Sequence, residues 1–292
     1  MLIGALEAGG TKMVCAIGDE NGKIHERRIL PTKTPKITMP EISAWFRDRK
    51  IEALGIGCFG PVDLNPGSPK YGYITSTPKE HWRDFDIVGF FRELMVPVGF
   101  DTDVNTSCLG EASWGSTKDV DSSIYITVGT GIGVGVMVEN QLLHGLTHPE
   151  AGHILVTRAA DDDFQGSCPF HRAPVFCLEG MASGPAIEAR WGKSGEKLTD
   201  RSDVWELIAY YLAQALMNYI LTLSPKRIVL GGGVMKQTRL YQLIRENIAR
   251  LINGYVPLPA LDEYIVPPAL ADDQGIMGAL KLAHKSFLLV NN

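Results

Sequence analysis

Three glycine-rich turns, each directly after an apolar run typical of a β-strand, limit the folds open to this chain of 292 residues. Glycine permits positive φ and has no Cβ, so such turns can direct several backbone N–H groups at one ligand. The turns are Glu7–Lys12, Thr127–Gly135 and Gly231–Val234. A single turn of this kind often marks only a bulge or tight packing, but three of them after strands favour polyphosphate binding.

The apolar runs around the first two turns follow the same order of strand, glycine turn and strand. In the first set, an Asn21-Gly22 pair adds a tight turn and a third strand, which predicts an antiparallel meander. The predicted strands are 2–7, 13–18 and 23–29 in the first set, and 123–128, 136–139 and 141–143 in the second. This repetition implies a duplicated domain.

Helices are predicted between and after these strands. An apolar repeat at three and four positions predicts a core helix that Asp203 caps and Pro225 ends. Further strands are predicted at 53–58, 96–100 and 227–230, and further helices at 87–94, 105–115, 240–251 and 274–287. Residues 144–185 are predicted to be irregular, which usually indicates function or an internal clamp. The alternation of strands and helices predicts an α/β fold with a domain junction near residue 118.

Composition excludes several classes of protein. The chain is 45% hydrophobic and 21% charged, which is ordinary for a globular protein of about two domains. A net charge of -5 and the lack of a basic block argue against a nucleic-acid or anionic-membrane surface. No apolar run reaches the roughly 18 residues of a membrane helix, and no leader pattern opens the chain, so we expect a cytoplasmic protein. Five cysteines, an odd number, predict reduced thiols.

Two cysteines and two histidines have spacing that suggests a metal site. His153, Cys168, His171 and Cys177 offer two thiolates and two imidazoles, a complete tetrahedral set for Zn²⁺. Because no ligand position is left open, the predicted site is structural. The alternative is two reduced cysteines near unrelated histidines, since His153 is fifteen residues from its nearest partner.

Asp103 is the candidate for acid–base chemistry, because it follows a predicted strand and opens a predicted helix. Aspartate is also a preferred helix N-cap, so capping is the alternative for Asp103, and the same holds for Asn105. Asp101 is the rival carboxylate, which we interpret as structural.

The ordered set of motifs resembles the ROK family of sugar kinases in the actin-like ATPase superfamily, and within it the bacterial fructokinase branch. The resemblance covers essentially the whole chain. It rests on the motifs Gly9-Gly10-Thr11-Lys12, Gly60-Pro61-Val62-Asp63, Asp103-Val104-Asn105, Thr127–Gly135, Glu150-Ala151-Gly152-His153, Cys177-Leu178-Glu179 and Gly231-Gly232-Gly233. Several motifs in order are far more specific than any one of them.

The resemblance implies a duplicated actin-like, ribonuclease H-like ATPase fold with two domains around a cleft. We expect an N-terminal domain at 1–117, rejoined by the C-terminal helix 274–292, and a C-terminal domain at 118–273. ATP and a hexose are the implied partners, together with Mg²⁺ and a structural Zn²⁺. A homodimer is a further expectation from the family.

The resemblance also implies individual roles. Asp103 is the expected general base that takes the proton of the attacking hydroxyl, since phosphoryl transfer otherwise needs positioning and charge neutralisation. Expected sugar-binding residues are Asn105, Glu150, His153, Glu179, Gly60 and Pro61. Expected nucleotide-binding residues are Gly9, Gly10, Thr11, Lys12, Thr130, Gly131, Gly133, Gly231, Gly232 and Gly233. From local sequence alone, Glu179 could be a surface charge and Lys12 a solvated strand charge.

The chain departs from the family pattern at two places. Glu7 stands where many relatives have aspartate, so direct Mg²⁺ coordination there is less secure than contact through water. His171 stands where a second thiol is common, and residues 172–176 lengthen the loop before Cys177.

The expected activity is transfer of the γ-phosphoryl group of ATP to a hexose, with D-fructose and its 6-hydroxyl as the first choice. That choice rests on Thr75–Lys79 and Trp82, which resemble the fructokinase branch but could instead form a hinge loop. Glucose or mannose kinases of the same family are the alternative. A sugar-responsive repressor of the family would carry an added N-terminal helix-turn-helix, and it is disfavoured because the first phosphate strand starts at Leu2. A noncatalytic nucleotide switch would not need Asp103, Glu150 and Glu179, and it is disfavoured because they are present.

Overall fold

The computed structural model describes residues 1–77 and 79–291. Pro78, in the segment expected to select fructose, and Asn292, at the end of the expected last domain segment, lie outside the described residues. The chain divides into two compact units. The first unit holds Met1–Asp119, Gly135–Pro149 and Ala269–Asn292, and the second holds Val120–Val134 and Glu150–Pro268. This division differs from the expected domains 1–117 and 118–273 in placing Gly135–Pro149 with the first unit.

A five-stranded sheet is the frame of the first unit. Its order is β3 (Ile24–Pro31), β2 (Lys12–Gly18), β1 (Ile3–Ala8), β4 (Ala53–Cys58) and β7 (Val98–Thr102). Strands β1 to β3 are antiparallel, as the predicted meander requires, whereas β1, β4 and β7 are parallel. The carboxyl ends of these three parallel strands therefore lie at one edge of the sheet.

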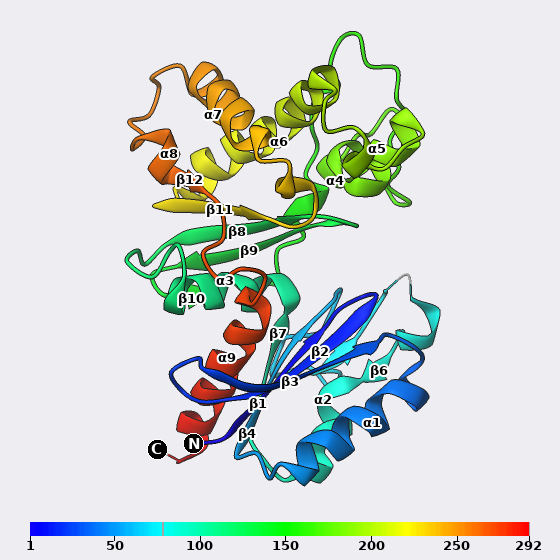
Figure 1. Ribbon diagram of the computed structural model, residues 1–292, viewed down its shortest axis with the longest axis vertical. Coiled ribbons are helices and arrows are strands. Elements are labelled where there is room, and N and C mark those ends of the chain that lie inside the picture. Colours follow the sequence, from blue (N-terminus) through cyan, green and yellow to red (C-terminus); the bar gives the residue numbers. More distant parts are fainter. Residues whose placement is uncertain (78, 292) are drawn as a thin grey trace. The chain divides into compact units, whose positions relative to one another are not determined.

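Two helices cover the two faces of this sheet (Figure 1). Side chains alternate along β1, so Leu6 joins the core under α1 (Pro35–Asp48), while Ile3 and Ala5 join the core under α9 (Gln274–Asn291). Helix α1 was not expected from the sequence. Pro35 and Pro40 obscure its periodicity, but Pro35 occupies the first turn, where a missing N–H costs nothing.

Helix α3 (Asp103–Trp114) packs closely on α9, and two glycines make this approach possible. A methyl group on Gly278 would lie 1.7 Å from the carbonyl oxygen of Thr106, and one on Gly110 would lie 2.1 Å from that of Gln274. The predicted helix 87–94 is split into α2 (Ile87–Phe90) and a 3₁₀ turn. A short β5 (Tyr73–Ile74) and β6 (Phe85–Asp86) precede it.

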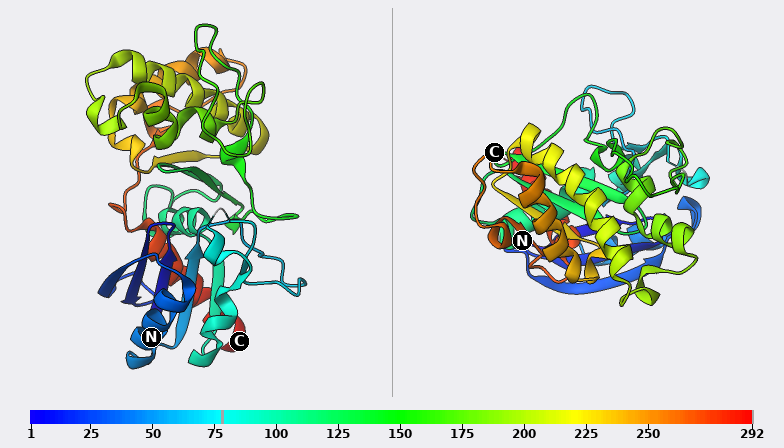
Figure 2. Two further views of the ribbon diagram at one scale, coloured as in Figure 1. Left: turned by 90° about the vertical axis from the view of Figure 1, so that its right-hand side faces the viewer. Right: turned by 90° about the horizontal axis from the view of Figure 1, so that it is seen from above.

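A second five-stranded sheet carries the glycine turns of the second unit. Its order is β10 (Gln141–Leu142), β9 (Ile132–Val138), β8 (Ser123–Val128), β11 (Arg227–Gly231) and β12 (Ile265–Val266), with β8 and β11 parallel. Helices α6 (Ser202–Leu223) and α7 (Arg239–Ile252) run side by side (Figure 2). The duplicated α/β fold is confirmed.

Three further helices complete the second unit, and two of them correct the sequence analysis. Helices α4 (Leu178–Ala182) and α5 (Gly184–Trp191) begin within the segment predicted to be irregular, and α8 (Leu261–Tyr264) follows α7. The prediction that Asp203 caps α6 is wrong: it lies in the first turn and accepts a hydrogen bond from Arg201 Nε at 2.8 Å. In the part of the chain that the structure describes, no helix combines the length and apolar character needed to span a membrane.

Candidate functional site

The parallel strands of the first unit bring three motifs to one edge of the sheet. Strand pairing places Ala8 opposite Cys58 and Cys58 opposite Thr102, and these residues end β1, β4 and β7. The Gly9-Gly10 turn and Asp103 follow directly, and the Gly60-Pro61 turn follows after one residue, Phe59. Because neighbouring strands are about 4.8 Å apart, the Gly9-Gly10 turn and Asp103 leave the sheet about 10 Å from each other.

Asp103 is the first residue of α3 and does not cap it. The cap is Thr102, whose hydroxyl accepts the backbone N–H of Asn105 at 3.1 Å. The half-buried Asp103 carboxylate accepts the N–H of Val104 at 2.9 Å. The capping alternative is therefore removed for Asp103, while its role as a base stays a prediction.

Asp101 is buried and makes structural bonds, as expected. Its carboxylate accepts bonds from the Thr102 N–H at 2.8 Å, the Asn105 side-chain amide at 2.7 Å and the ring of His144 at 2.9 Å. The hydrogen bond and charge of Asp101 raise the pKa of His144 above its usual value, although partial burial opposes this. Spacing gave no signal of this pair, since His144 lies 43 residues away in sequence.

Asn105 is 1% exposed, and its amide nitrogen is used by Asp101. Its Oδ1 atom is buried and has no hydrogen-bond partner among the described residues. Sugar contact by Asn105 stays a prediction, and the structure adds that Asp101 fixes the orientation of its amide.

The Gly60-Pro61 turn is tied to two other segments of the first unit. The carbonyl oxygen of Pro61 accepts the backbone N–H of Thr75 at 2.8 Å and its hydroxyl at 3.0 Å. The next residue, Val62, donates its N–H to the ring of His148 at 3.2 Å. Burial lowers the pKa of His148, which favours the neutral ring that this bond requires. The predicted sugar turn and the predicted fructose segment are thus physically joined.

Glu7 lies beside the first turn of α9. A methyl group on Gly275 would lie 2.9 to 3.1 Å from the atoms of the Glu7 carboxyl group. Burial raises the pKa of Glu7, and the charge of Lys12 partly offsets this effect. A partly desolvated carboxyl next to a glycine turn suits a cation or its bound water.

In the second unit, the two remaining glycine turns meet. Pairing of β8 with β11 places Thr127 opposite Gly231, so both turns leave the same edge of that sheet. A methyl group on Gly129 would lie 3.9 Å from the backbone nitrogen of Gly233, and the Gly129 carbonyl accepts the N–H of Gly184 at 2.8 Å. The predicted nucleotide residues Thr130, Gly131, Gly133, Gly231, Gly232 and Gly233 therefore share one region of the second unit.

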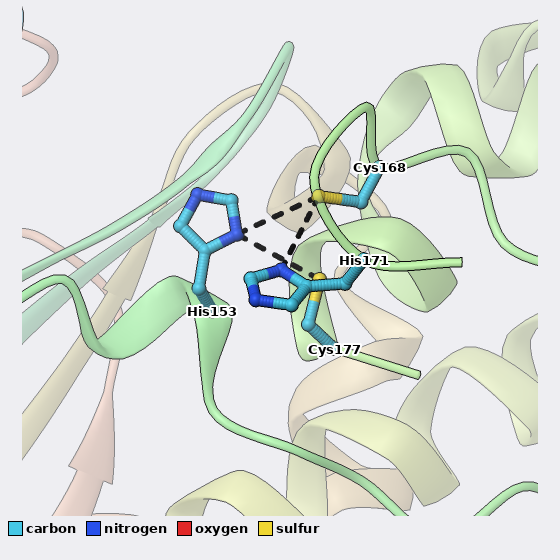
Figure 3. A group of neighbouring side chains, drawn as sticks. All are labelled: His153, Cys168, His171 and Cys177. Carbon is cyan, nitrogen blue, oxygen red and sulfur yellow. Dashed lines mark hydrogen bonds between the residues drawn. The ribbon is translucent and has the colours of Figure 1, made fainter. Parts of the chain in front are cut away.

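The four predicted metal ligands lie together (Figure 3). Their donor atoms are all within 4.8 Å of one another. The Cys168 sulfur is 3.7 Å from Nδ1 of His153 and 3.6 Å from Nδ1 of His171, and the Cys177 sulfur is 3.7 Å from Nδ1 of His153. Zinc bonds of about 2.3 Å to sulfur and 2.05 Å to nitrogen give a tetrahedral S···N edge of about 3.6 Å. The cluster fits a tetrahedral metal, and the four residues lie together as the predicted site requires, while zinc binding stays a prediction.

The surroundings of the Cys177 thiol also suit metal binding. Burial and the neighbouring Cys168 raise the pKa of its thiol to about 12, against the effect of a hydrogen bond from the Gly180 N–H. A bound cation reverses this balance because it stabilises the thiolate.

His153 links the cluster to the predicted sugar carboxylates. Its Nδ1 faces the two thiols, while its Nε2 is 3.8 Å from a carboxylate oxygen of Glu179. The other oxygen of Glu179 accepts the N–H of Ile132 at 2.9 Å. Burial, together with the charge of Glu179, raises the pKa of Glu150. The interpretation of Glu179 as a solvated surface charge does not fit these contacts.

Comparison with known proteins agrees with these motifs. The family model described as "ROK family" matches residues 3–286. A fructokinase of Pediococcus pentosaceus is 47% identical over 97% of this chain and 98% of its own length. A fructokinase of Streptococcus mutans is 43% identical over 97% and 98%, respectively. The crystal structure of a ROK hexokinase from Thermus thermophilus superposes with a TM-score of 0.79 at 25% identity, covering 100% of this chain and 99% of that one. This chain belongs to the ROK family.

Proposed function

We propose that this protein transfers the γ-phosphoryl group of ATP to a hexose, with D-fructose as the substrate and its 6-hydroxyl as the acceptor. The observation that carries the proposal is the shared sheet edge of the first unit, where a glycine turn, the Gly60-Pro61 turn and Asp103 follow neighbouring parallel strands. Functional residues of α/β sheets gather at the carboxyl ends of strands.

Asp103 acts as the general base in this proposal. Its place at the start of α3 holds it on a rigid element, and its carboxylate is partly accessible. Withdrawal of the hydroxyl proton accompanies attack on phosphorus, and the leaving ADP keeps the bonding electrons of the broken P–O bond. Mg²⁺ bound with ATP would neutralise phosphate charge, and Glu7, next to the first glycine turn, would hold one of its waters.

Glu150, His153 and Glu179 bind sugar hydroxyls in this proposal. Carboxylates accept hydrogen bonds from hydroxyls, and a sugar that leaves one unpaired loses affinity. Zn²⁺ held by His153, Cys168, His171 and Cys177 would supply structural order to the loop that carries Glu179. Because one nitrogen of His153 faces the cluster, the other must carry the proton and can donate to Glu179 or to the sugar.

The choice of fructose is supported by two observations. Relatives at 43–47% identity are named fructokinases. The segment from Thr75 onward, which resembles that branch, is hydrogen-bonded to Pro61 in the sugar turn. Homodimer formation stays a prediction from the resemblance, and a cytoplasmic location stays a prediction from the sequence.

A panel of hexoses and aminohexoses in a coupled assay of ADP release tests the function. We expect the highest kcat/KM with fructose, and fructose 6-phosphate as the product by NMR. ADP release that does not depend on the sugar would indicate a nucleotide switch. A higher kcat/KM for glucose or mannose than for fructose would indicate a glucose or mannose kinase of the same family.

The variant Asp103→Asn tests the base. We expect kcat to fall about 10²- to 10⁴-fold with sugar affinity within several-fold, because the amide cannot take a proton. Asp48→Asn, on the exposed end of α1, is the matched control and should keep wild-type kinetics. Half of the wild-type turnover in Asp103→Asn would place the base elsewhere.

A further inference from the structure

Lys79 lies against the first glycine turn, although 68 residues separate it from Thr11 in the sequence. A methyl group on Gly10 would lie 3.0 Å from Cε and 3.7 Å from Nζ of Lys79. The end of the lysine side chain therefore rests over the Cα of Gly10, within the first unit.

The backbone around Lys79 is fixed by buried contacts. Its N–H donates to the hydroxyl of Thr77 at 3.3 Å, and its carbonyl accepts the N–H of Trp82 at 2.8 Å. Trp82 is 2% exposed and packs edge-on against Phe59 and Phe85 at centroid distances of 5.8 and 5.5 Å.

The two residues Thr32 and Lys33 are hydrogen-bonded both to the first glycine turn and to the helical turn after Lys79. Trp82 donates its ring N–H to the carbonyl of Lys33 at 2.8 Å. The preceding residue, Thr32, donates its hydroxyl to the Gly9 carbonyl at 2.7 Å and its N–H to the Thr11 carbonyl at 2.9 Å. Lys79 and the first glycine turn are thus positioned by the same two neighbouring residues, so the fold keeps them close together.

Lys79 as a whole residue is intermediate in exposure, and its ammonium group forms no ion pair with a described residue. Lys70 and Lys226, by contrast, pair with Asp84 and Asp121 at 2.7 and 2.6 Å. Among the described residues, no acceptor is seen for the backbone N–H groups of Gly10 and Thr11 either. A cation without a counter-charge and unpaired backbone N–H groups beside it together favour an anion.

We propose that Lys79 is a further residue of the phosphate site and that its ammonium group binds the γ-phosphoryl group during transfer. The inference rests on the proposed function, since it requires ATP as the donor. It also gives the segment 75–79 a second role, because Thr75 is tied to the sugar turn while Lys79 contacts phosphate. A fixed cation opposite the γ-phosphoryl oxygens stabilises charge in the transition state.

The variants Lys79→Met and Lys79→Arg test this role, because methionine keeps the unbranched stem and arginine keeps the charge. For Lys79→Met we expect kcat to fall about 10²-fold while the KM for fructose stays within about threefold. Lys79→Arg should recover at least about a tenth of the wild-type kcat, since the cation is restored. Lys70→Met, an exposed lysine of the same unit, is the matched control and should keep wild-type kcat.

Calorimetric binding of a non-hydrolysable ATP analogue and of ADP identifies which phosphate is contacted. We expect Lys79→Met to weaken the analogue about tenfold or more and to leave ADP unchanged. Equal weakening of both nucleotides would overturn the γ-phosphoryl assignment. Wild-type kcat in Lys79→Met, or an altered fructose KM alone, would overturn the phosphate role. An inactive wild-type protein would instead refute the proposed function, so the two failures are distinguishable.

Discussion

At the scale of residues, Asp101 and Asp103 are two carboxylates two positions apart with different surroundings. Asp101 is 2% exposed at the end of β7, and it is saturated by bonds to Thr102, Asn105 and His144. Asp103 is partly accessible at the start of α3. Burial removes Asp101 from reaction with a substrate and makes it a support for the residues around it.

The Asp101–His144 pair gives a prediction about pH. Because the folded pKa of His144 is raised, its contribution to stability is fully present below the ordinary histidine pKa of about 6.5 and is lost as pH rises through the raised value. The pKa of the other nearby histidine, His148, is instead lowered by burial, so the raised pKa belongs to His144. His144→Gln should therefore lower the melting temperature more at about pH 5.5 than at about pH 9.

Thermal unfolding of both proteins across this range is the measurement, with His81→Gln, an exposed ring, as the control. If the difference in melting temperature between wild type and His144→Gln does not change with pH, the His144 ring contributes to stability only by packing.

At the scale of elements, the segment from Glu150 to Glu179 is tied to α6 by hydrogen bonds of Ala151, Thr157 and Ala159, and two further points of attachment differ in their need for a metal. The first is the cluster of two cysteines and two histidines. The second is Asp162, which is 8% exposed and accepts bonds from Arg190, at 2.7 Å, and from the hydroxyl of Tyr211. Since the second point needs no metal, loss of a metal should disorder the part around Cys168 and leave the rest attached.

Removal of metal gives the corresponding prediction. Structural zinc contributes about 10 kcal/mol of apparent free energy in small peptides, so its loss should release His153 and with it the hydrogen-bond geometry of Glu179. We expect chelation or Cys168→Ser to abolish sugar phosphorylation while ADP binding persists.

Metal content by atomic absorption, the kinase rate and calorimetric ADP binding are measured together. Cys15→Ala changes a buried thiol outside the cluster and is the control. An unchanged rate after verified metal loss would be incompatible with a structural metal in this loop.

At the scale of the whole molecule, the two ends of the chain complete one sheet-and-helix layer. Helix α9 lies mainly against β4, β1 and β7 of the first unit and also reaches β2. Four of its side chains are at most 1% exposed: Ile276, Ala279, Leu280 and Ala283. The sheet face beneath them, formed by Ile3, Ala5, Val14 and Ala16, is apolar.

Truncation before Gln274 should therefore unfold the first unit. Exposure of both apolar surfaces costs on the order of 5 kcal/mol or more, which is comparable with the whole stability of a domain. Circular dichroism and urea unfolding measure the effect. Truncation after Phe287 removes the exposed Leu288, Leu289 and Val290 and is the control. A cooperative transition near that of wild type in the shorter protein would contradict this account of α9.

Much of this architecture was predictable from the sequence because it depends on local patterns of residues. Strand–glycine–strand order predicted both sheets, and cysteine and histidine identity predicted the cluster. The remainder depends on contacts between distant segments. His144 meets Asp101, and Lys79 meets Gly10, only after the sheet has formed. Helix α1 was missed because Pro40 interrupts its helical hydrophobic pattern. In the folded protein, packing of Ile42 and Phe46 in the core stabilises the helix despite this proline.

The division of the chain into units has a consequence for how such proteins can diversify. Its boundaries fall after Asp119, Val134, Pro149 and Pro268, so the polypeptide passes from one unit to the other four times, once within β9. A single recombination breakpoint between two homologous genes cannot exchange either unit intact. Inheritance of a new nucleotide or sugar preference is thus expected to proceed by point substitution or short loop replacement.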